Sequence, residues 1–307
     1  MKPLISVNIC TYNRKKLLKK TIDSLLNQNI DEHFSYEIII IDDGSTDDTK
    51  ILINDITTAS KIKIKYFYKE KHGIADARNR GLNESSGEWI AFIDDDEIAD
   101  SNWLNELMKT AISESADCVG GAIQLLIPES SVVEVKSATR KHLGESLASN
   151  PFKNIFNYKG PGTGNVLVHK SVFDKIGSFN SAFYDAGEDQ DFFIRARSAG
   201  FFIAFTSDAI VYHVITEDRL SDDSLKLTAK KNGTSLAYFD WRDRGALKTT
   251  LISLIRIAHS IFFIFSRYLW FFLKRDKGHI LSSKCSIWTM KAYICYVFDR
   301  LTLNKNK

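Results

Sequence analysis

The sequence has few cysteines and little net charge, and both shortages exclude classes of protein. Only four cysteines occur in 307 residues, and none forms a Cys-x-x-Cys pair (Cys10, Cys118, Cys285, Cys295). Neither a zinc site nor a disulfide framework is therefore indicated, and we expect reduced, buried thiols. The net charge of +3 is too small to favour nucleic acid as a partner. With 44% hydrophobic and 26% charged residues, the chain is of ordinary globular composition and long enough for a full core.

Two nucleotide-binding signatures and a leader segment are also missing. No Gly-x-x-x-x-Gly-Lys-Ser/Thr occurs, which argues against a P-loop NTPase. The glycines of Gly160–Asn165 lack the spacing of a dinucleotide fingerprint, and we interpret them as a loop where backbone closely approaches a neighbour. Leu4–Cys10 is too short for the apolar region of a signal peptide and is followed by polar residues. We therefore expect the catalytic part of the chain to remain in the cytoplasm.

Short apolar runs alternate with segments of helical periodicity in the first part of the chain. We expect strands over Leu4–Cys10, Tyr36–Ile41, Ile62–Tyr68 and Trp89–Ile93. We expect helices over Arg14–Asn27, over a segment with the apolar face Ile51, Leu52 and Ile56, over Ile74–Asn83, and over Asn102–Ser113 with Trp103, Leu107 and Met108 inward. This alternation predicts βαβ units in a doubly wound, mostly parallel, Rossmann-like α/β sheet.

Regular patterning loosens after Cys118–Leu126. Residues 128–159 show weak periodicity, and a loop this long in a compact domain is usually functional or mobile. Order returns with a predicted strand over Val166–Val168 and a helix over Phe192–Ser198. Phe201–Phe205 and Ala209–His213 are predicted as two closing strands.

Acidic residues gather at three places that we expect to share one edge of this sheet. They form the clusters Asp42/Asp43, Asp94–Glu97 and Glu188/Asp189/Asp191. Adjacent carboxylates repel and cannot all be buried unpaired, whereas Mg²⁺ or Mn²⁺ prefers carboxylate oxygens with substrate phosphates completing the shell. Arg14 and Arg78 lie nearby in the predicted fold, and arginines suit phosphate. The clusters indicate a nucleotide-diphosphate site; solvated turns that cap the following helices are the alternative.

Five motifs occur in order along residues 4–215 and together resemble a family of enzymes. They are Ser6–Arg14 (SVNICTYNR), Ile41–Asp47 (IDDGSTD), Ala77–Gly81 (ARNRG), Phe92–Asp96 (FIDDD) and Gly187–Asp191 (GEDQD). This set is similar to that of family 2 inverting glycosyltransferases of GT-A fold. Glu97 departs from the pattern, because aspartate is often found there, but it keeps the charge.

The resemblance implies a role for each matching residue. Donor contacts would come from Thr11, Asn13, Arg14, Asp42, Asp43, Arg78, Asp94 and Asp95. A divalent metal, Mn²⁺ or Mg²⁺, would be held by Asp94, Asp96 and His213, although a lone histidine after a strand is more often structural. Asp189 would be the catalytic base, supported by Glu188 and Asp191.

The implied reaction is inverting hexosyl transfer from a nucleotide-diphosphate sugar, UDP-linked, to a hydroxyl of a glycan or lipid-linked acceptor, as in bacterial-type cell-surface polysaccharide synthesis. The chemistry agrees, because a metal neutralises the diphosphate leaving group and one carboxylate deprotonates the acceptor. A metal-dependent nucleotidyltransferase or a non-catalytic nucleotide-sugar-binding module are the alternatives. Release of a nucleoside diphosphate instead of pyrophosphate separates the first from the transferase.

We expect residues 1–220 to form the GT-A catalytic domain, with a nucleotide-binding half (1–100) and an acceptor half (101–220), and residues 221–307 to form a helical extension. Thr249–Leu273 is the most apolar stretch, with Arg256, Ser260, Arg267 and Lys274 in one narrow stripe of a helix. Two arginines make a membrane-spanning helix costly. We therefore expect a salt-sensitive, in-plane helix on the inner face of the membrane, and Ile287–Leu301 as a further helix. Packing against protein is the alternative.

Overall fold

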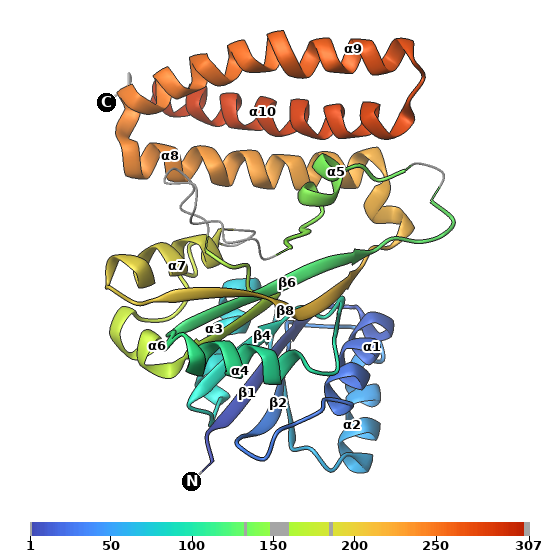
Figure 1. Cartoon of the computed structure of the whole chain (residues 1–307), viewed down its shortest axis with the longest axis vertical. Coiled ribbons are helices and arrows are strands. Elements are labelled where there is room, and N and C mark those ends of the chain that lie inside the picture. The colour runs from blue at the N-terminus through green and yellow to red at the C-terminus, as the bar shows by residue number, and fades with distance from the viewer. Residues whose placement is uncertain (1, 132–133, 148–159, 184–186, 304–307) are drawn as a thin grey trace. The chain divides into compact units, whose positions relative to one another are not determined.

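The computed structural model describes residues 2–131, 134–147, 160–183 and 187–303 (Figure 1). The chain divides into two compact units. The first comprises Met1–Leu126 and Ser146–Val214, and the second comprises Ile127–Glu145 and Ile215–Lys307. Part of the loop predicted over residues 128–159 therefore groups with the C-terminal helices, and residues 132–133 and 148–159 of that loop lie outside the described residues.

An eight-stranded mixed sheet is the centre of the first unit. Its strands are β1 (Leu4–Thr11), β2 (Ser35–Asp42), β3 (Ile64–Tyr68), β4 (Trp89–Ile93), β5 (Glu97–Ala99), β6 (Cys118–Leu126), β7 (Asn165–His169) and β8 (Ile203–Val214). The strand order is β3-β2-β1-β4-β7-β6-β8-β5. Strands β1 to β4 run parallel, whereas β7 is antiparallel to both of its neighbours and β5 is antiparallel to β8. The α/β class and the mostly parallel sheet predicted from the sequence are thus confirmed.

Helices cover both faces of this sheet. They are α1 (Lys15–Leu26), α2 (Thr49–Ala59), α3 (Ile74–Glu84), α4 (Trp103–Ser113), α6 (Lys170–Ile176) and α7 (Glu188–Ser198). One core cluster joins the sheet to α1, α2 and α4, and another joins it to α3, α6 and α7. In α1 the fully buried Leu18, Ile22 and Leu25 recur at helical spacing, as the sequence predicts. Trp103, Leu107 and Met108 of α4 are buried, which confirms their predicted orientation.

Three sequence-based expectations about these elements are wrong. Of the face predicted for α2, Ile56 does pack against the core, but Ile51 is 60% exposed and Ile53 is buried completely, because the helix turns its Thr49–Ile53 side toward the core. The two predicted closing strands form the single strand β8. Its pairing with β6 passes from Gly120–Phe205 to Ala122–Ile210, so residues 206–209, which include the exposed Ser207 and Asp208, bulge out of the pairing between the two predicted strands. Helix α7 begins at Glu188 and not at Phe192, so its acidic residues lie inside the helix.

Trp103 connects helix α4 to the sheet through a buried asparagine. The fully buried indole donates its Nε1–H to Asn165 Oδ1 at 2.8 Å. The Asn165 amide then donates to the carbonyl oxygens of Ala122 at 2.8 Å and Ala209 at 2.9 Å, so it joins β7 to β6 and β8. This chain of hydrogen bonds holds the antiparallel part of the sheet in register.

We expect Trp103→Phe to lower the free energy of unfolding by about 1–3 kcal/mol through the lost hydrogen bond, because Asn165 Oδ1 would remain buried without its donor. Urea unfolding followed by circular dichroism measures the change. Asn165→Leu should cost more, since it removes three hydrogen bonds at once. A Trp103→Phe variant as stable as the parent chain would contradict this role for the indole.

The second unit is helical. It contains α5 (Ser137–His142), the 3₁₀ turn η2 (Glu217–Leu220), α8 (Asp222–His259), the π-helical segment η3 (Ser260–Phe265), α9 (Ser266–Leu273) and α10 (Lys277–Leu303). Gly245, with φ of 76°, interrupts α8, and the chain reverses direction there (Figure 1). The helical residues that follow Gly245, up to the end of α9 (residues 246–273), are called the outer helix below. Helix α10 lies between the first half of α8 and this outer helix (Figure 1). The helices predicted over Thr249–Leu273 and Ile287–Leu301 are confirmed.

Candidate active site

The acidic run after β4 forms a tight turn that Glu97 closes at both ends. The Glu97 backbone N–H donates to the Asp94 carbonyl oxygen at 3.2 Å, and its Oε2 accepts the Asp94 N–H at 3.0 Å. Glu97 is 3% exposed, and burial raises the pKa of its carboxyl well above the ordinary value. Gly164 packs against this carboxyl, where a Cβ atom would lie 2.6 Å from Glu97 Oε1. The turn therefore presents Asp94, Asp95 and Asp96 in one fixed arrangement.

Arg14, just before α1, binds two of these aspartates. Its Nη1 donates to Asp95 Oδ1 and to Asp96 Oδ2, both at 2.8 Å. Thr11, the last residue of β1, donates its hydroxyl to Asp95 Oδ2 at 2.7 Å. Burial raises the pKa of Asp95 to about 6, although Arg14 acts in the opposite direction. Each oxygen of Asp95 thus accepts one side-chain hydrogen bond, and the carboxylate positions Thr11 and Arg14 at the end of β1.

Arg78 joins the end of β4 to the start of α7. Its Nη2 donates to Asp94 Oδ1 at 3.1 Å, and its Nη1 donates to Glu188 Oε1. Burial opposes the charge of Arg78, but Asp94 and Glu188 outweigh it and raise the pKa of the guanidinium. Burial likewise raises the pKa of the Glu188 carboxyl. Within the described residues Glu188 Oε2 has no hydrogen-bond partner, so this buried carboxyl is only half satisfied.

Asp189 and Asp191 lie in the first turn of α7, which begins after Gly187 in a left-handed conformation. Their predicted place at a strand end is therefore wrong, although Arg78 still connects their turn with Asp94. Asp189 is half-buried, and its Oδ1 accepts the Gln190 N–H at 2.6 Å. Burial is the main cause that raises the pKa of Asp189. Asp191 pairs instead with Arg195 one turn along the helix, at 2.9 Å.

Asp42 is the last residue of β2 and Asp43 follows it, and both organise the neighbouring loops. Asp42 accepts the hydroxyl of Tyr66 and the Ser45 N–H, both at 2.7 Å. Asp43 pairs with Lys69 at 2.5 Å and accepts backbone N–H groups of the loop after β3. Neither aspartate touches the Asp94–Glu97 turn through any contact described.

Asn13 connects the loop after β1 to the loop after β2. It has a positive φ of 52°, and its Oδ1 accepts the Thr46 N–H at 2.7 Å. Tyr12 beside it is 40% exposed, and Lys71 Nζ lies 3.6 Å from its ring centroid. Two loops and an accessible aromatic ring therefore adjoin one another at this end of the sheet.

His213, near the end of β8, lies beside the acidic turn. It is opposite Glu97 in the β5–β8 pair, and its Nε2 is 3.5 Å from Asp96 Oδ2. This nitrogen is buried and makes no hydrogen bond within the described residues. No group of three or more histidine, cysteine or carboxylate side chains is arranged to hold a metal in the described ranges. The structure thus brings Asp96 and His213 together, whereas Asp94 is turned to Arg78.

Eight of the predicted site residues thus form two connected groups. Thr11, Arg14, Asp95, Asp96 and His213 make one group; Arg78, Asp94 and Glu188 make the other, with Asp189 next in the chain. The sequence did not single out Tyr66 and Lys69, which hold Asp42 and Asp43. Their signal was weak: Tyr66 lies in the middle of β3, the strand that pairs with β2, and Lys69 directly follows that strand.

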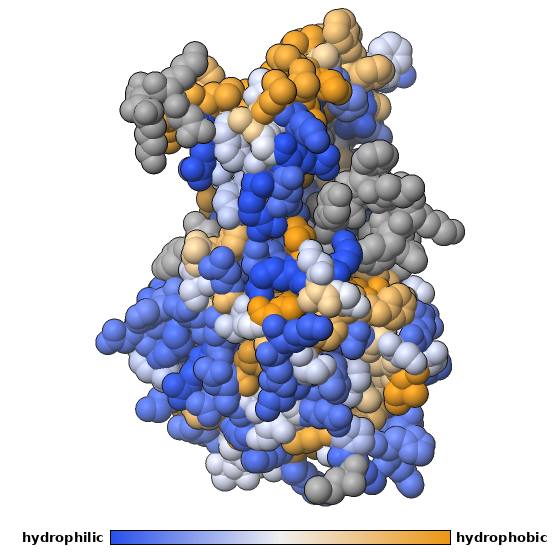
Figure 2. Space-filling model, turned by 90° about the vertical axis from the view of Figure 1, so that its left-hand side faces the viewer, coloured by the Kyte–Doolittle hydropathy of each residue, from blue (hydrophilic) through white to orange (hydrophobic). Residues whose placement is uncertain are grey.

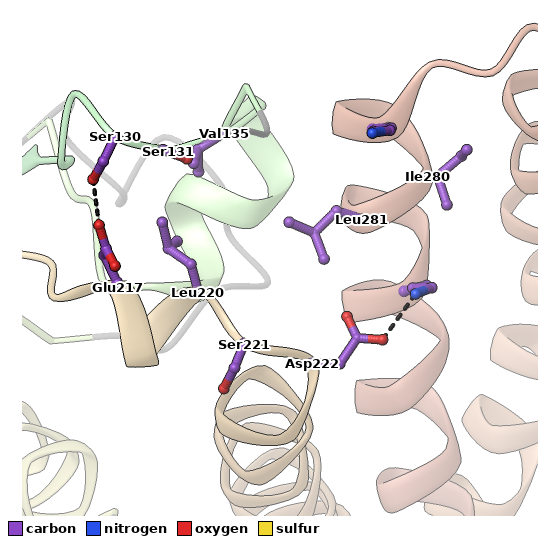
Figure 3. A pocket seen from close by; sticks show the side chains of 11 residues that line it. Ser130, Ser131, Val135, Glu217, Leu220, Ser221, Asp222, Ile280 and Leu281 are labelled. Atoms are coloured by element: carbon purple, nitrogen blue, oxygen red, sulfur yellow. Dashed lines mark hydrogen bonds and ion pairs between the residues drawn. The ribbon is translucent and has the colours of Figure 1, made fainter.

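A cavity of about 480 Å³ lies elsewhere, lined entirely by residues of the second unit (Figure 3). Leu220 and Leu281 point into it from opposite sides, and the Lys284–Asp222 ion pair of 2.8 Å closes one wall (Figure 3). It contains none of the site residues predicted from the sequence. Charge and geometry therefore place the candidate chemistry at the sheet edge and not in this cavity.

Comparison with solved structures supports the same fold. Mannosyltransferase PcManGT from Pyrobaculum calidifontis, solved with GDP-Man and Mn²⁺, is similar with a TM-score of 0.66 at 14% identity, over 97% of this chain and 88% of that one. TarS 1–349 of S. aureus, in complex with UDP-GlcNAc, gives a TM-score of 0.53 at 18% identity, over 96% and 91% of the two chains. These neighbours have the GT-A fold.

Sequence relatives agree. The chain is 28% identical to the glycosyltransferase AglE of Haloferax volcanii over 213 residues, or 69% of this chain and 67% of AglE. It is 28% identical to the succinoglycan biosynthesis protein ExoM of Rhizobium meliloti over 71% of this chain and 69% of ExoM. The family description "Glycosyl transferase family 2" matches residues 6–177, which is more than half of the chain. The chain therefore belongs to glycosyl transferase family 2 and is a glycosyltransferase.

Proposed function

We propose that this glycosyltransferase moves a hexose, with inversion, from a UDP-linked donor to a hydroxyl of a glycan or lipid-linked acceptor in polysaccharide synthesis. One observation carries the proposal: Arg78 joins Asp94, at the end of a central strand, to Glu188, which precedes Asp189. Arg78 thus connects two places: the sheet edge at which a nucleotide would bind, and the start of α7, where the carboxylate of Asp189 would act as base. The proposed catalytic domain spans residues 1–220, with the donor bound by residues 1–100 and the acceptor by residues 101–220.

Donor binding is assigned to the ends of β1, β2 and β4. The loops held by Asn13, Asp42 and Asp43 would receive the nucleoside, with Thr11 beside them. Arg14 and Arg78 would meet the diphosphate, because a guanidinium binds phosphate oxygens through paired N–H groups. The solved neighbour TarS holds UDP-GlcNAc, which supports a UDP-linked donor.

The site fits a divalent metal, Mn²⁺ or Mg²⁺. The unbonded His213 Nε2 next to the Asp96 carboxylate supplies two ligands, and such metals commonly take the remainder from substrate phosphates. Asp94, a third candidate, would first have to leave Arg78. When bound, the metal neutralises the charge that develops on the leaving diphosphate. The Mn²⁺ in PcManGT supports this assignment.

Asp189 is assigned as the general base. Its carboxylate would take the proton of the acceptor hydroxyl as that oxygen attacks the anomeric carbon from the face opposite the diphosphate. A single displacement of this kind inverts the anomeric centre. Glu188 would hold Arg78, and Asp191, through Arg195, would hold the first turn of α7.

The acceptor and the membrane are linked in this proposal. A relative from Campylobacter jejuni, 37% identical over 39% of this chain and 38% of its own length, is named GalNAc(5)-diNAcBac-PP-undecaprenol beta-1,3-glucosyltransferase. Its name contains a lipid-linked substrate, which favours a lipid-linked acceptor here. We assign residues 249–273 to the membrane surface and the enzyme to the cytoplasmic side.

A hydrolysis screen over nucleotide sugars with Mn²⁺ and Mg²⁺ tests the proposal. We expect one UDP-sugar to be hydrolysed slowly, with UDP as product. Release of pyrophosphate would identify a nucleotidyltransferase instead. Binding of nucleotide sugars without turnover in the presence of many acceptors would identify a non-catalytic module.

The pH dependence of turnover should report the environment of Asp189. Because burial raises the pKa of this carboxyl, and a base works only when ionised, activity should be lost as the pH falls through a value above the ~4 of an exposed aspartate. The profile of kcat at saturating donor and metal measures this acid limb. Asp189→Asn should lack the limb in its residual activity. A limb at or below pH ~4 would argue against Asp189 as the base.

A further inference from the structure

The outer helix exposes an apolar face over almost its whole length. Its exposed side chains include Leu247, Leu251, Leu254, Ile255, Phe262 and Leu273, all more than half exposed. Hydrophobic side chains gather over this end of the helical unit (Figure 2). Soluble monomers rarely expose so large a continuous apolar patch.

Polar side chains of the same helix point the other way, toward the rest of the unit. Thr249 is fully buried and donates to the Asp240 carbonyl oxygen at 2.9 Å, and Ser253 is 6% exposed. Between Thr249 and Arg256 the outer helix thus buries hydroxyl groups and exposes leucine and isoleucine, the reverse of a helix on a water-soluble protein. Small and hydroxyl-bearing residues between helices are typical of helices packed in lipid.

Arg256 is neutralised inside the unit. Its Nη2 donates to Asp240 Oδ2 at 3.1 Å, and its guanidinium lies 4.5 Å from the centroid of the Tyr293 ring. Tyr293 donates its hydroxyl to the same Asp240 oxygen at 2.9 Å, and Arg244 pairs with the other at 3.0 Å. The sequence-based expectation that Arg256 faces lipid headgroups in a cationic stripe is therefore wrong. The charge of Arg256 is therefore already paired within the unit, and Arg267 is the exposed arginine of this helix.

Helix α10 determines how deep the outer helix can go. Among the described residues, only the helices of Asp222–Leu273, which Gly245 divides, contain 18 residues in a row apolar enough to cross a membrane. Helix α10 packs along the outer helix but carries the exposed Lys291, Asp299 and Arg300. Charges of this kind are costly in hydrocarbon. With α10 attached, the outer helix can lie in the plane of a bilayer but cannot cross it.

A groove between the outer helix and α10 continues the apolar face. It has a volume of about 340 Å³ and is lined by Ile261 and Phe265 of the π-helical segment and by Met290 and Ile294 of α10, among others. Its serine hydroxyl, on Ser260, already donates to the Arg256 carbonyl oxygen at 2.8 Å. Such a lining suits a hydrocarbon chain, and Lys291 at its edge suits a lipid phosphate.

We propose that the outer helix lies in the plane of a bilayer with its outward face in the hydrocarbon of one leaflet, held by apolar contact and not by charge, and that a phospholipid acyl chain fills the groove. The proposal rests on the membrane part of the proposed function and specifies its partner as the leaflet interior. It differs from the salt-sensitive contact predicted from the sequence, because Arg256 is turned inward.

Co-sedimentation of the full-length protein tests the mode of binding. With vesicles of phosphatidylcholine alone, we expect binding close to that with added phosphatidylglycerol, and little loss at high salt. Ile255→Glu should lower the partition about tenfold or more, because it removes an exposed apolar side chain that the leaflet would bury and adds a charge. The matched control is Leu227→Glu, at a 57% exposed leucine in the first half of α8, which should partition like the parent.

Three results would overturn the proposal: binding only to anionic vesicles with loss at high salt, no binding to either vesicle, or a lipid-free dimer that Ile255→Glu dissociates. Donor hydrolysis by Ile255→Glu, measured without vesicles, distinguishes failure of the membrane proposal from failure of the proposed transferase reaction. Loss of partition with normal hydrolysis concerns the membrane face alone. Absence of hydrolysis in the parent chain, with partition as expected, concerns the proposed reaction alone.

Cys295 reports on the groove directly. It lines the groove and is the exposed one of the four cysteines, all of which the structure describes. At ten times its Kd, monomeric dihexanoylphosphatidylcholine should slow alkylation of Cys295 about tenfold, since only the lipid-free fraction reacts. Ile261→Trp fills the groove and should abolish this protection, whereas Ile255→Trp on the same helix should not. Alkylation unaffected by the lipid would exclude a chain in the groove.

Discussion

Asp189→Asn should leave donor binding nearly intact and lower turnover by about 10²-fold or more, the usual scale for a lost general base. The amide has nearly the shape of the carboxylate but cannot accept the acceptor proton. Asp189 is also the residue after Glu188, whose bond to Arg78 the substitution leaves in place. Single-turnover kinetics with saturating UDP-sugar measures kcat, and calorimetry with UDP measures binding.

Two neighbours on the same helical turn serve as controls. Asp191→Asn breaks the ion pair with Arg195 and should act through the stability of α7, with the acid limb of the pH profile unmoved. Glu188→Gln changes the partner of the buried Arg78 and should weaken donor binding as well as turnover. If kcat of Asp189→Asn fell by less than a few fold, the base would have to be sought among these two.

Asp96→Ala should remove the metal-dependent part of donor binding. Asp96 lies between Arg14 and the unbonded His213 Nε2, so it is the carboxylate through which a hard cation would be held. We expect the affinity for UDP with Mn²⁺ to fall by about 10²-fold or more, because loss of outer-sphere partners alone costs 10–100-fold. Calorimetry with Mn²⁺, with Mg²⁺ and with a chelator measures this difference.

Comparison with two further variants makes the result specific to the metal. His213→Ala should also reduce the gain in UDP affinity that the metal provides. Asp43→Asn, which disturbs the loop held through Lys69, should weaken UDP binding equally with and without metal. An Asp96→Ala enzyme that kept its full metal-dependent gain in affinity would place the metal elsewhere.

Local patterns along the chain were enough to predict the α/β fold and the positions of most of its elements. Continuous apolar runs such as Ile38–Ile41 favour central strands buried on both faces, and helical spacing predicts the buried side of α1. The order of the motifs predicted the family, because five short motifs rarely occur in the same order by chance. These features are local, so they can be recognised in the sequence without knowledge of what packs against them.

Pairing between distant residues was decided only by the tertiary structure. The motifs could not say that Asp94 would bond to Arg78 while Asp96 meets Arg14 and His213, because these partners come from separate strands and helices. The start of α7 at Glu188 likewise depends on Gly187 and on the buried Arg78.

The outer helix shows the same limit most clearly. Its sequence determined that one side is apolar and the other carries Arg256, but not which side faces out. Only the position of Asp240 and Tyr293 turns the arginine inward and leaves leucine and phenylalanine exposed. Periodicity defines the two faces of a helix, whereas the partner that covers one of them is chosen by contacts far away in the chain.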